Sequence, residues 1–158
     1  MIMKKFIITI ILALATSLSF TANAQITITK SESQLKEVKT ISPYWEWLYT
    51  DKTEDGETQY LWALKSTNQF DKNWFWLSLG TNKEECIASI NSLIEIFDTA
   101  GKEDVYYIKD KYGETIAVSV IKAMGKQLIF RDTNHRYAGH AQTEKIFLNK
   151  LLKYFEEL

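Results

Sequence analysis

The sequence predicts an α+β fold in which an antiparallel sheet of about six strands carries two amphipathic helices on one face. Three observations lead to this class. Runs of aromatic and β-branched residues are separated by loops short enough for hairpins, two segments repeat apolar residues at helical spacing, and each of those segments follows three strand-like runs. The predicted order is therefore βββα-βββα after a short N-terminal strand region.

The first 24 residues have the three-part layout of a secretory signal peptide. Two lysines precede an apolar run that extends to about residue 20, and residues 22–24 (ANA) form an A-x-A cleavage site before Gln25. The run is shorter than the ~20 residues that span a bilayer, so we expect cleavage and no stable membrane insertion. The sequence thus predicts a signal peptide over 1–24, one α+β domain over 25–158, and a periplasmic or secreted protein.

Composition narrows the classes of function. Without residues 1–24, Lys+Arg falls from 19 to 17 while Asp+Glu stays at 20, so the net charge changes from −1 to −3. A mildly acidic chain without a basic run gives no reason to expect nucleic acid as a partner. Cys86 is the single cysteine, which excludes a disulfide framework, so the fold must depend on its hydrophobic core. The sequence has no phosphate-binding loop or catalytic signature, so we expect no cofactor, and it leaves the oligomeric state open.

After the cleavage site the strand pattern is weak at first and becomes clear from residue 44. Residues 25–39 are polar and weakly patterned, and we expect one or two short strands there. Three stronger strands follow at 44–49, 59–65 and 74–80, each rich in aromatic and aliphatic residues. The polar stretch DKTEDGE at 51–57 is typical of a hairpin loop, with Asp55-Gly56 at the turn, and such a loop requires antiparallel neighbours.

An amphipathic helix is predicted from about residue 83 to residue 99. Thr81 with Glu84, and Asn82 with Glu85, both have the spacing of a capping box, and the Ala-Gly pair at 100–101 is a suitable end. The apolar stripe recurs at intervals of four, three and four residues: Cys86, Ile90, Leu93 and Phe97. This stripe places the cysteine in the core as a small apolar residue rather than as a reactive thiol.

The second half repeats this order of elements. Strands are predicted at 104–110, 114–123 and 127–132, with Gly113 able to take positive φ at the first turn. The middle strand is apolar on both faces at 116–121, which is typical of a central strand. A helix is predicted from about residue 141 to residue 157. Its stripe consists of Phe147 or Leu148, then Leu151, Phe155 and Leu158.

All five tryptophans lie between residues 45 and 76, in the first three strong strands. Because side chains alternate between the faces of a strand, each of these strands has one aromatic side and one mostly aliphatic side. If the three strands pair in sequence order, their aromatic sides can coincide and form a candidate binding face. Its members are Trp45, Trp47, Tyr49, Tyr60, Trp62, Trp74 and Trp76.

Two interpretations of this face stay open. In the first it is a second core, covered by residues 25–41 or by loops, because tryptophan is mostly buried and a large exposed aromatic patch lowers solubility. In the second it is a partly open platform that binds a glycan by stacking or an envelope protein through a hot spot.

The stretch RDTNHRYAGH at 131–140 contains the weaker candidates for chemistry: Asp132, His135 and His140. An aspartate with two histidines suits a metal ion or a general base. Their spacing matches no zinc signature, so a polar connection before the last helix is the simpler interpretation.

The sequence favours a small exported binding module that acts through its aromatic face. One alternative is a periplasmic inhibitor or immunity-type protein, which would also need only a surface. The other is a minor enzyme built around the 131–140 loop.

Overall fold

The computed structural model describes residues 34–68, 74–122, 125–133 and 139–158. The chain falls into two compact units, Met1–Glu32 and Ser33–Leu158, and every described residue lies in the second. The predicted signal peptide therefore lies outside the described residues. No helix within them is long and apolar enough to cross a membrane.

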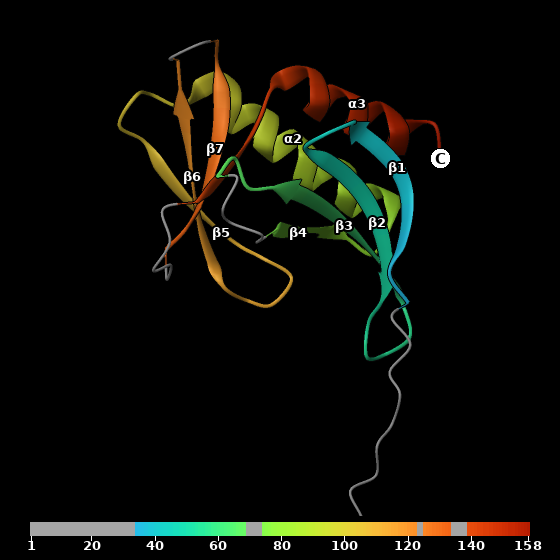
Figure 1. The fold of residues 1–158 in the computed structure, drawn as a ribbon. Helices are drawn as coiled ribbons and strands as arrows, with labels where there is room; N and C mark the ends of the chain where they lie inside the picture. The colour runs from blue at the N-terminus through green and yellow to red at the C-terminus, as the bar shows by residue number, and fades with distance from the viewer. Residues whose placement is uncertain (1–33, 69–73, 123–124, 134–138) are drawn as a thin grey trace, which may run out of the picture. The chain divides into compact units, whose positions relative to one another are not determined.

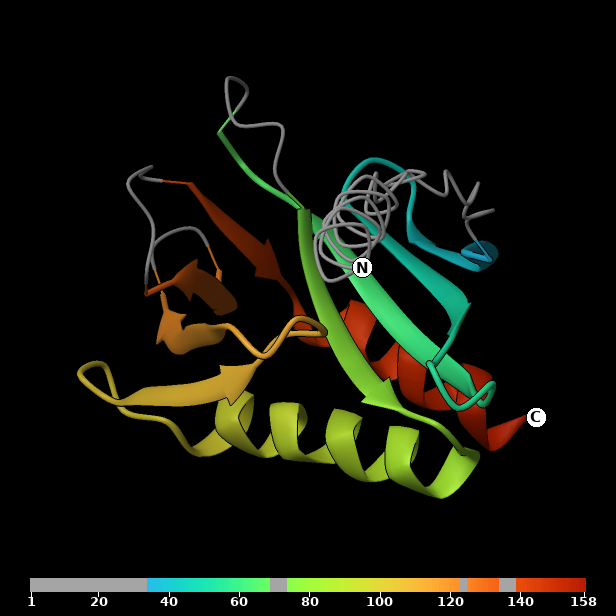
Figure 2. The same cartoon turned by 90° about the horizontal axis from the view of Figure 1, so that it is seen from below.

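The first half of the unit is a four-stranded antiparallel sheet followed by a helix (Figure 1). The strands β1 (Lys36–Ser42), β2 (Glu46–Lys52), β3 (Thr58–Lys65) and β4 (Trp74–Gly80) pair in sequence order. The β2–β3 hairpin closes with Gly56 at φ 82, which confirms the predicted turn. Helix α2 (Lys83–Thr99) then packs along β4, as Figure 2 shows.

The second half repeats this plan. Strands β5 (Val105–Lys109), β6 (Thr115–Ile121), β7 (Gln127–Asp132) and β8 (His140–Thr143) form another antiparallel sheet in sequence order, and helix α3 (Lys145–Glu156) follows. Strand β6 lies inside the sheet, as its apolar faces predict. The α+β class is confirmed, and among the described residues each half contains four strands followed by one helix.

The predicted single sheet of about six strands is wrong in detail, because the described residues form eight strands in two sheets. The missed strand β8 occupies the start of the predicted final helix, which begins at Lys145 rather than at Ala141. Strand β8 pairs with β7 through Arg131 opposite His140 and Leu128 opposite Thr143. A four-residue strand has too little alternation to be distinguished from the polar loop before it.

Helix α2 begins and ends where the sequence predicts. Of the two capping pairs, the structure selects Asn82 with Glu85: the Glu85 backbone N–H donates to Asn82 Oδ1 at 2.9 Å. The carboxylate of Glu85 accepts from the backbone N–H of Thr81 at 2.8 Å, one residue before the position of a standard capping box. Gly80 has φ +145, and a Cβ there would lie 2.5 Å from the Cβ of Glu85. The strand can therefore turn tightly into the helix only with glycine at this position.

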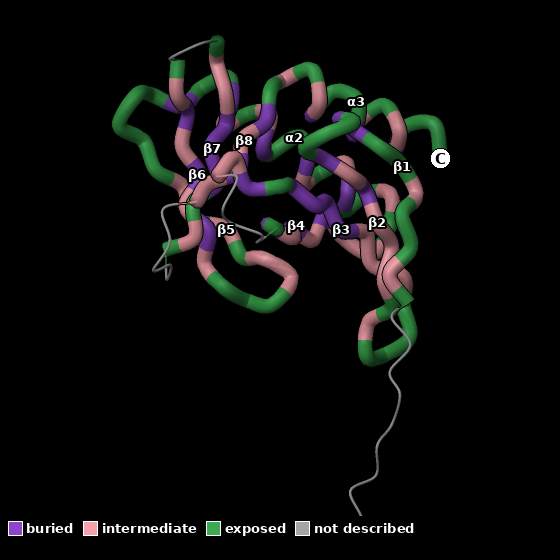
Figure 3. The backbone as a smooth tube through the Cα atoms, in the orientation of Figure 1, coloured by how far each residue is buried: buried purple, intermediate pink, exposed green. Residues whose placement is uncertain are grey.

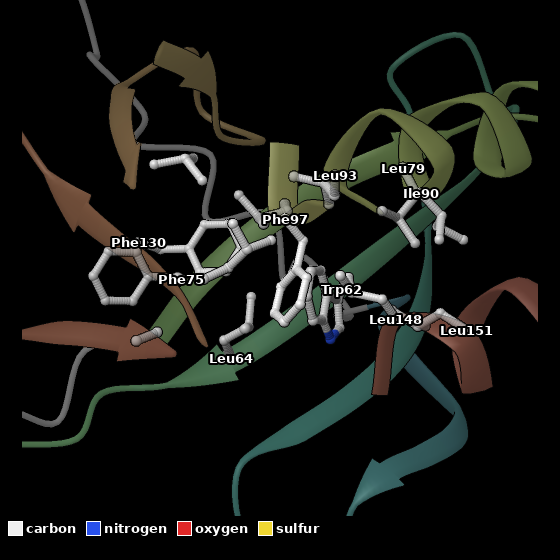
Figure 4. Packing of buried hydrophobic residues seen from close by; sticks show 14 of the residues in the cluster. Trp62, Leu64, Phe75, Leu79, Ile90, Leu93, Phe97, Phe130, Leu148 and Leu151 are labelled. Atoms are coloured by element: carbon white, nitrogen blue, oxygen red, sulfur yellow. The ribbon is translucent and has the colours of Figure 1, made fainter. Parts of the chain in front are cut away.

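Both helices and the facing sides of both sheets share one hydrophobic core. Figure 4 shows Trp62 and Phe130, from the two sheets, among side chains of α2 and α3, and Figure 3 shows that most of the β2–β3 loop is exposed. Leu148, Leu151 and Phe155 of the predicted α3 stripe are fully buried, whereas Leu158 is exposed. Cys86 is buried as predicted, and burial raises the pKa of its thiol to about 12, so it is unreactive.

Candidate functional site

The two faces of the first sheet follow from its register. Residues directly opposite each other in antiparallel strands share a face. Trp47 lies opposite Ala63, which lies opposite Trp76, and Tyr49 lies opposite Leu61. These residues form the outer face, whereas the alternate positions form the inner face in the core shared with the helices.

The prediction that all five tryptophans share one face is wrong for Trp62. The assignment of Tyr60 to that face is wrong for the same reason. Trp62 lies opposite Leu48 and Leu77 on the inner face and is fully buried, with its ring 5.7 Å from that of Phe130. The ring of Tyr60 lies 5.1 Å from that of Phe155 on α3. The cause is the register of the β2–β3 hairpin, which pairs odd-numbered residues with odd-numbered ones, so the aromatic sides of β2 and β3 face in opposite directions.

The other predicted binding residues form an outer aromatic cluster: Trp45, Trp47, Tyr49, Trp74 and Trp76. The ring of Trp74 lies 4.9 Å from Trp47 and 6.3 Å from Trp76, between centroids, and Trp76 lies 5.3 Å from Tyr49. Trp45 precedes β2, but its carbonyl accepts from the backbone N–H of Lys65 at 2.8 Å. Trp45 therefore stands in one row with Lys65 and Trp74 across the end of the sheet.

The outer aromatic cluster is neither a covered core nor a fully open platform. Trp45 is 44% exposed and Trp74 is 37% exposed, whereas Trp47, Tyr49 and Trp76 are half-buried. Burial of Tyr49, with the negative charge of Glu37 nearby, raises the pKa of its hydroxyl. Of the segment 25–41 that would cover this face as a second core, residues 36–41 instead belong to the edge strand β1 beside β2. Residues 25–33 lie outside the described part of the chain.

Two lysines that the sequence interpretation missed contact the cluster at opposite ends. The ammonium of Lys65 lies 5.7 Å from the ring centroid of Trp45. The ammonium of Lys111 lies 5.0 Å from the centroids of Trp76 and Tyr112 and forms an ion pair with Asp51 at 3.7 Å. Strand alternation beyond Ala63 predicts the position of Lys65. Nothing local predicts Lys111, because it comes from the β5–β6 turn of the other sheet.

The 131–140 candidates do not assemble within the described residues. Arg131 lies opposite His140, so the neighbouring Asp132 belongs to the other face of that sheet, and His135 lies outside the described residues. The His140 ring nitrogen Nε2 lies 3.1 Å from the hydroxyl of Thr67. Burial, with a contribution from Arg131, lowers the pKa of His140. No group of three His, Cys, Asp or Glu residues in the described ranges has a geometry that would hold a metal ion.

Two clefts lie away from the outer aromatic cluster. A mostly apolar one of about 490 Å³ separates the end of α2 from the end of β6. A second, of about 380 Å³, lies between β1 and α3 and is bordered by Lys39, Lys150, Lys153 and Glu157. No histidine, cysteine or serine is among the described residues that line either cleft, so the outer aromatic cluster is the stronger candidate site.

No protein-family model, no curated protein and no solved structure matches this chain.

Proposed function

We propose that this chain is an exported binding module that docks a protein partner on the outer aromatic cluster. The observation that carries the proposal is the row Trp45–Lys65–Trp74, in which two indole rings more than a third exposed flank a lysine. Exposed tryptophans next to a half-buried aromatic layer match the composition of protein-binding hot spots. The signal-peptide layout of residues 1–24 supports the exported location, and places the partner in the cell envelope or outside the cell.

A protein partner suits the cluster better than a neutral glycan. Sugar stacking favours rings that present a common plane. The ring planes of Trp74 and Trp76 come nearest to this, at 29°, but those of Trp47 and Trp74 are inclined by 49° and those of Tyr49 and Trp76 by 56°. A glycan site also needs polar side chains for hydroxyl groups. On this face the amide of Gln59 already donates to the hydroxyl of Ser78 at 2.7 Å.

The test is capture from the envelope fraction of the source organism, with variants that separate the cluster from other exposed aromatic residues. Trp45→Ala and Trp74→Ala remove the two exposed indoles. Tyr107→Ala is the matched control, because Tyr107 is 68% exposed and lies in β5 of the second sheet. We expect one stoichiometric protein to be captured by the parent chain and by the control, and to be lost with either tryptophan variant.

Retention of the partner by both tryptophan variants would rule out this surface. Retention of the parent chain on polysaccharide, lost in the same variants, would identify a glycan module instead. If the captured protein is an enzyme and its activity falls on binding, the module acts as an envelope inhibitor.

A further inference from the structure

We infer that Lys65, held between Trp45 and Trp74, receives a carboxylate side chain of the protein partner. This inference rests on the proposed function and specifies the chemistry of the partner at one end of the outer aromatic cluster. It depends on the position of Lys65, on its lack of a counter-ion and on the separation of charge along the face.

The row is built by the backbone. The carbonyl of Trp45 accepts the N–H of Lys65 at 2.8 Å, and Lys65 is the register partner of Trp74. Lys65 therefore lies on β3 with Trp45 on one side and Trp74 on the other. Each indole carries an N–H donor, and no described residue accepts a hydrogen bond from either of them. The row thus presents one cation and two donors, all suited to a negatively charged acceptor.

Lys65 has no counter-ion among the described residues, and its ammonium lies over the ring of Trp45. Lys111 provides the contrast within the same cluster, because Asp51 neutralises it at 3.7 Å and its side chain is only 16% exposed. A cation over an aromatic ring, exposed and without an anion, keeps its capacity to bind a carboxylate.

Charge is separated along the face. The carboxylates of Glu37 and Asp51 belong to the Tyr49 end, since Glu37 is the register partner of Tyr49 and Asp51 lies two residues beyond it. Tyr49 is four residues from Trp45, which is about 13 Å along an extended strand. That distance exceeds the Debye length of about 8 Å at physiological ionic strength, so these carboxylates do not cancel the field at Lys65. An acidic side chain on an apolar segment of the partner therefore complements the Lys65 end.

The test follows the indole N–H signals of the purified protein by ¹H–¹⁵N NMR. The probe is a blocked pentapeptide in which glutamate alternates with leucine, and its counterpart carries glutamine in place of glutamate. The buried Trp62 indole is an internal control for folding. Lys65→Gln removes the exposed cation, and Lys111→Gln is the matched control at the other end of the cluster.

We expect the glutamate peptide to shift the Trp45 and Trp74 signals in a saturable way and to leave the Trp62 signal unchanged. The glutamine peptide, and the glutamate peptide with Lys65→Gln, should bind about fivefold more weakly, which is the size of an exposed charge pair. Raised salt should weaken the glutamate peptide selectively. Lys111→Gln should change the affinity by less than about twofold.

Equal affinity for the two peptides would overturn the inference but leave docking on the aromatic cluster in place. No saturable shift with either peptide at millimolar concentration would also overturn it, and the capture experiment would then decide on the proposed function by itself. Tighter binding of polygalacturonate than of the glutamate peptide would assign the site to an acidic glycan, which contradicts a protein partner.

Discussion

Glu46 on β2 accepts a hydrogen bond from the hydroxyl of Thr143 on β8 at 2.8 Å, across 97 residues of sequence. Glu46 is 1% exposed, and this bond joins the two sheets inside the shared core. Its second carboxyl oxygen and the indole N–H of Trp62 have no hydrogen-bond partner among the described residues. Burial raises the pKa of Glu46 to about 8, and the negative charge of Glu144 adds to the rise, whereas the hydrogen bond from Thr143 and the positive charge of Lys150 lower it.

This carboxyl makes stability depend on pH in a defined window. The folded protein keeps the Glu46 proton up to about pH 8, whereas the unfolded chain loses it near pH 4.5. The folded state therefore binds more protons between these values, and the free energy of unfolding should fall as pH rises through them, by up to about 1.4 kcal/mol per pH unit. Chemical denaturation at intervals from pH 4.5 to pH 8.5 measures this slope.

Glu46→Gln should remove most of that slope, because glutamine keeps the size and the acceptor for Thr143 but cannot ionise. Glu54→Gln, in the exposed β2–β3 loop, is the matched control and should keep it. Parallel pH profiles for the parent protein and Glu46→Gln would show that the buried carboxyl does not set the pH dependence.

The shared core gives a second prediction. Leu93 of α2 is 5% exposed and Leu151 of α3 is fully buried. Truncation to alanine removes apolar contacts and leaves a cavity, so each change should lower the free energy of unfolding by roughly 2–5 kcal/mol. Ile146→Ala, at an exposed α3 position, should cost less than about 0.5 kcal/mol. Equal losses at all three positions, measured by denaturant titration, would contradict the assigned helix faces.

Export is the third prediction. The A-x-A site at residues 22–24 should be cleaved in a bacterial host with an intact secretion system, so that intact-mass spectrometry shows Gln25 at the N-terminus. Ala24→Asp, which places a charged residue in the cleavage site, should block processing. Recovery of uncleaved parent protein from the membrane fraction would contradict the predicted location.

The elements of the fold could be predicted from the sequence because their signals are local. Helix α2 carries its cap, its apolar stripe and its end within residues 82–101, and the structure places it at Lys83–Thr99. The β2–β3 hairpin carries its turn at Gly56. Strand β8 has only four residues, and its pairing with β7 depends on residues that lie across a loop. Local patterns therefore predict the class and most elements, but not the full strand number.

The site could be predicted only in part, because a face is a property of paired strands. Alternation assigns Trp47 and Tyr49 to one side of β2, and Trp74 and Trp76 to one side of β4, and both assignments hold. Which side of β3 joins them depends on the register of the β2–β3 hairpin. A shift of that register by one residue would turn the other side of β3 outward. Trp62 was therefore assigned to the wrong face.

The last prediction separates the two kinds of tryptophan. Trp62 is fully buried and contacts Phe130, so Trp62→Ala should lower the free energy of unfolding by roughly 3–5 kcal/mol. Trp74 is 37% exposed on the outer face, so Trp74→Ala should change it by no more than about 1 kcal/mol, most of it from lost ring contacts. Urea denaturation of both variants measures the difference.

Fluorescence provides an independent readout of the same assignment. Iodide should quench the emission of Trp45 and Trp74 in the folded protein. The emission that iodide does not quench should be blue-shifted, because it comes from the buried Trp62. Replacing Trp62 by phenylalanine should remove that resistant fraction, whereas replacing Trp74 by phenylalanine should reduce the accessible one. If Trp74→Ala instead destabilises the protein as strongly as Trp62→Ala and its emission resists iodide, the outer aromatic cluster is a second core, and the docking surface proposed for it does not exist.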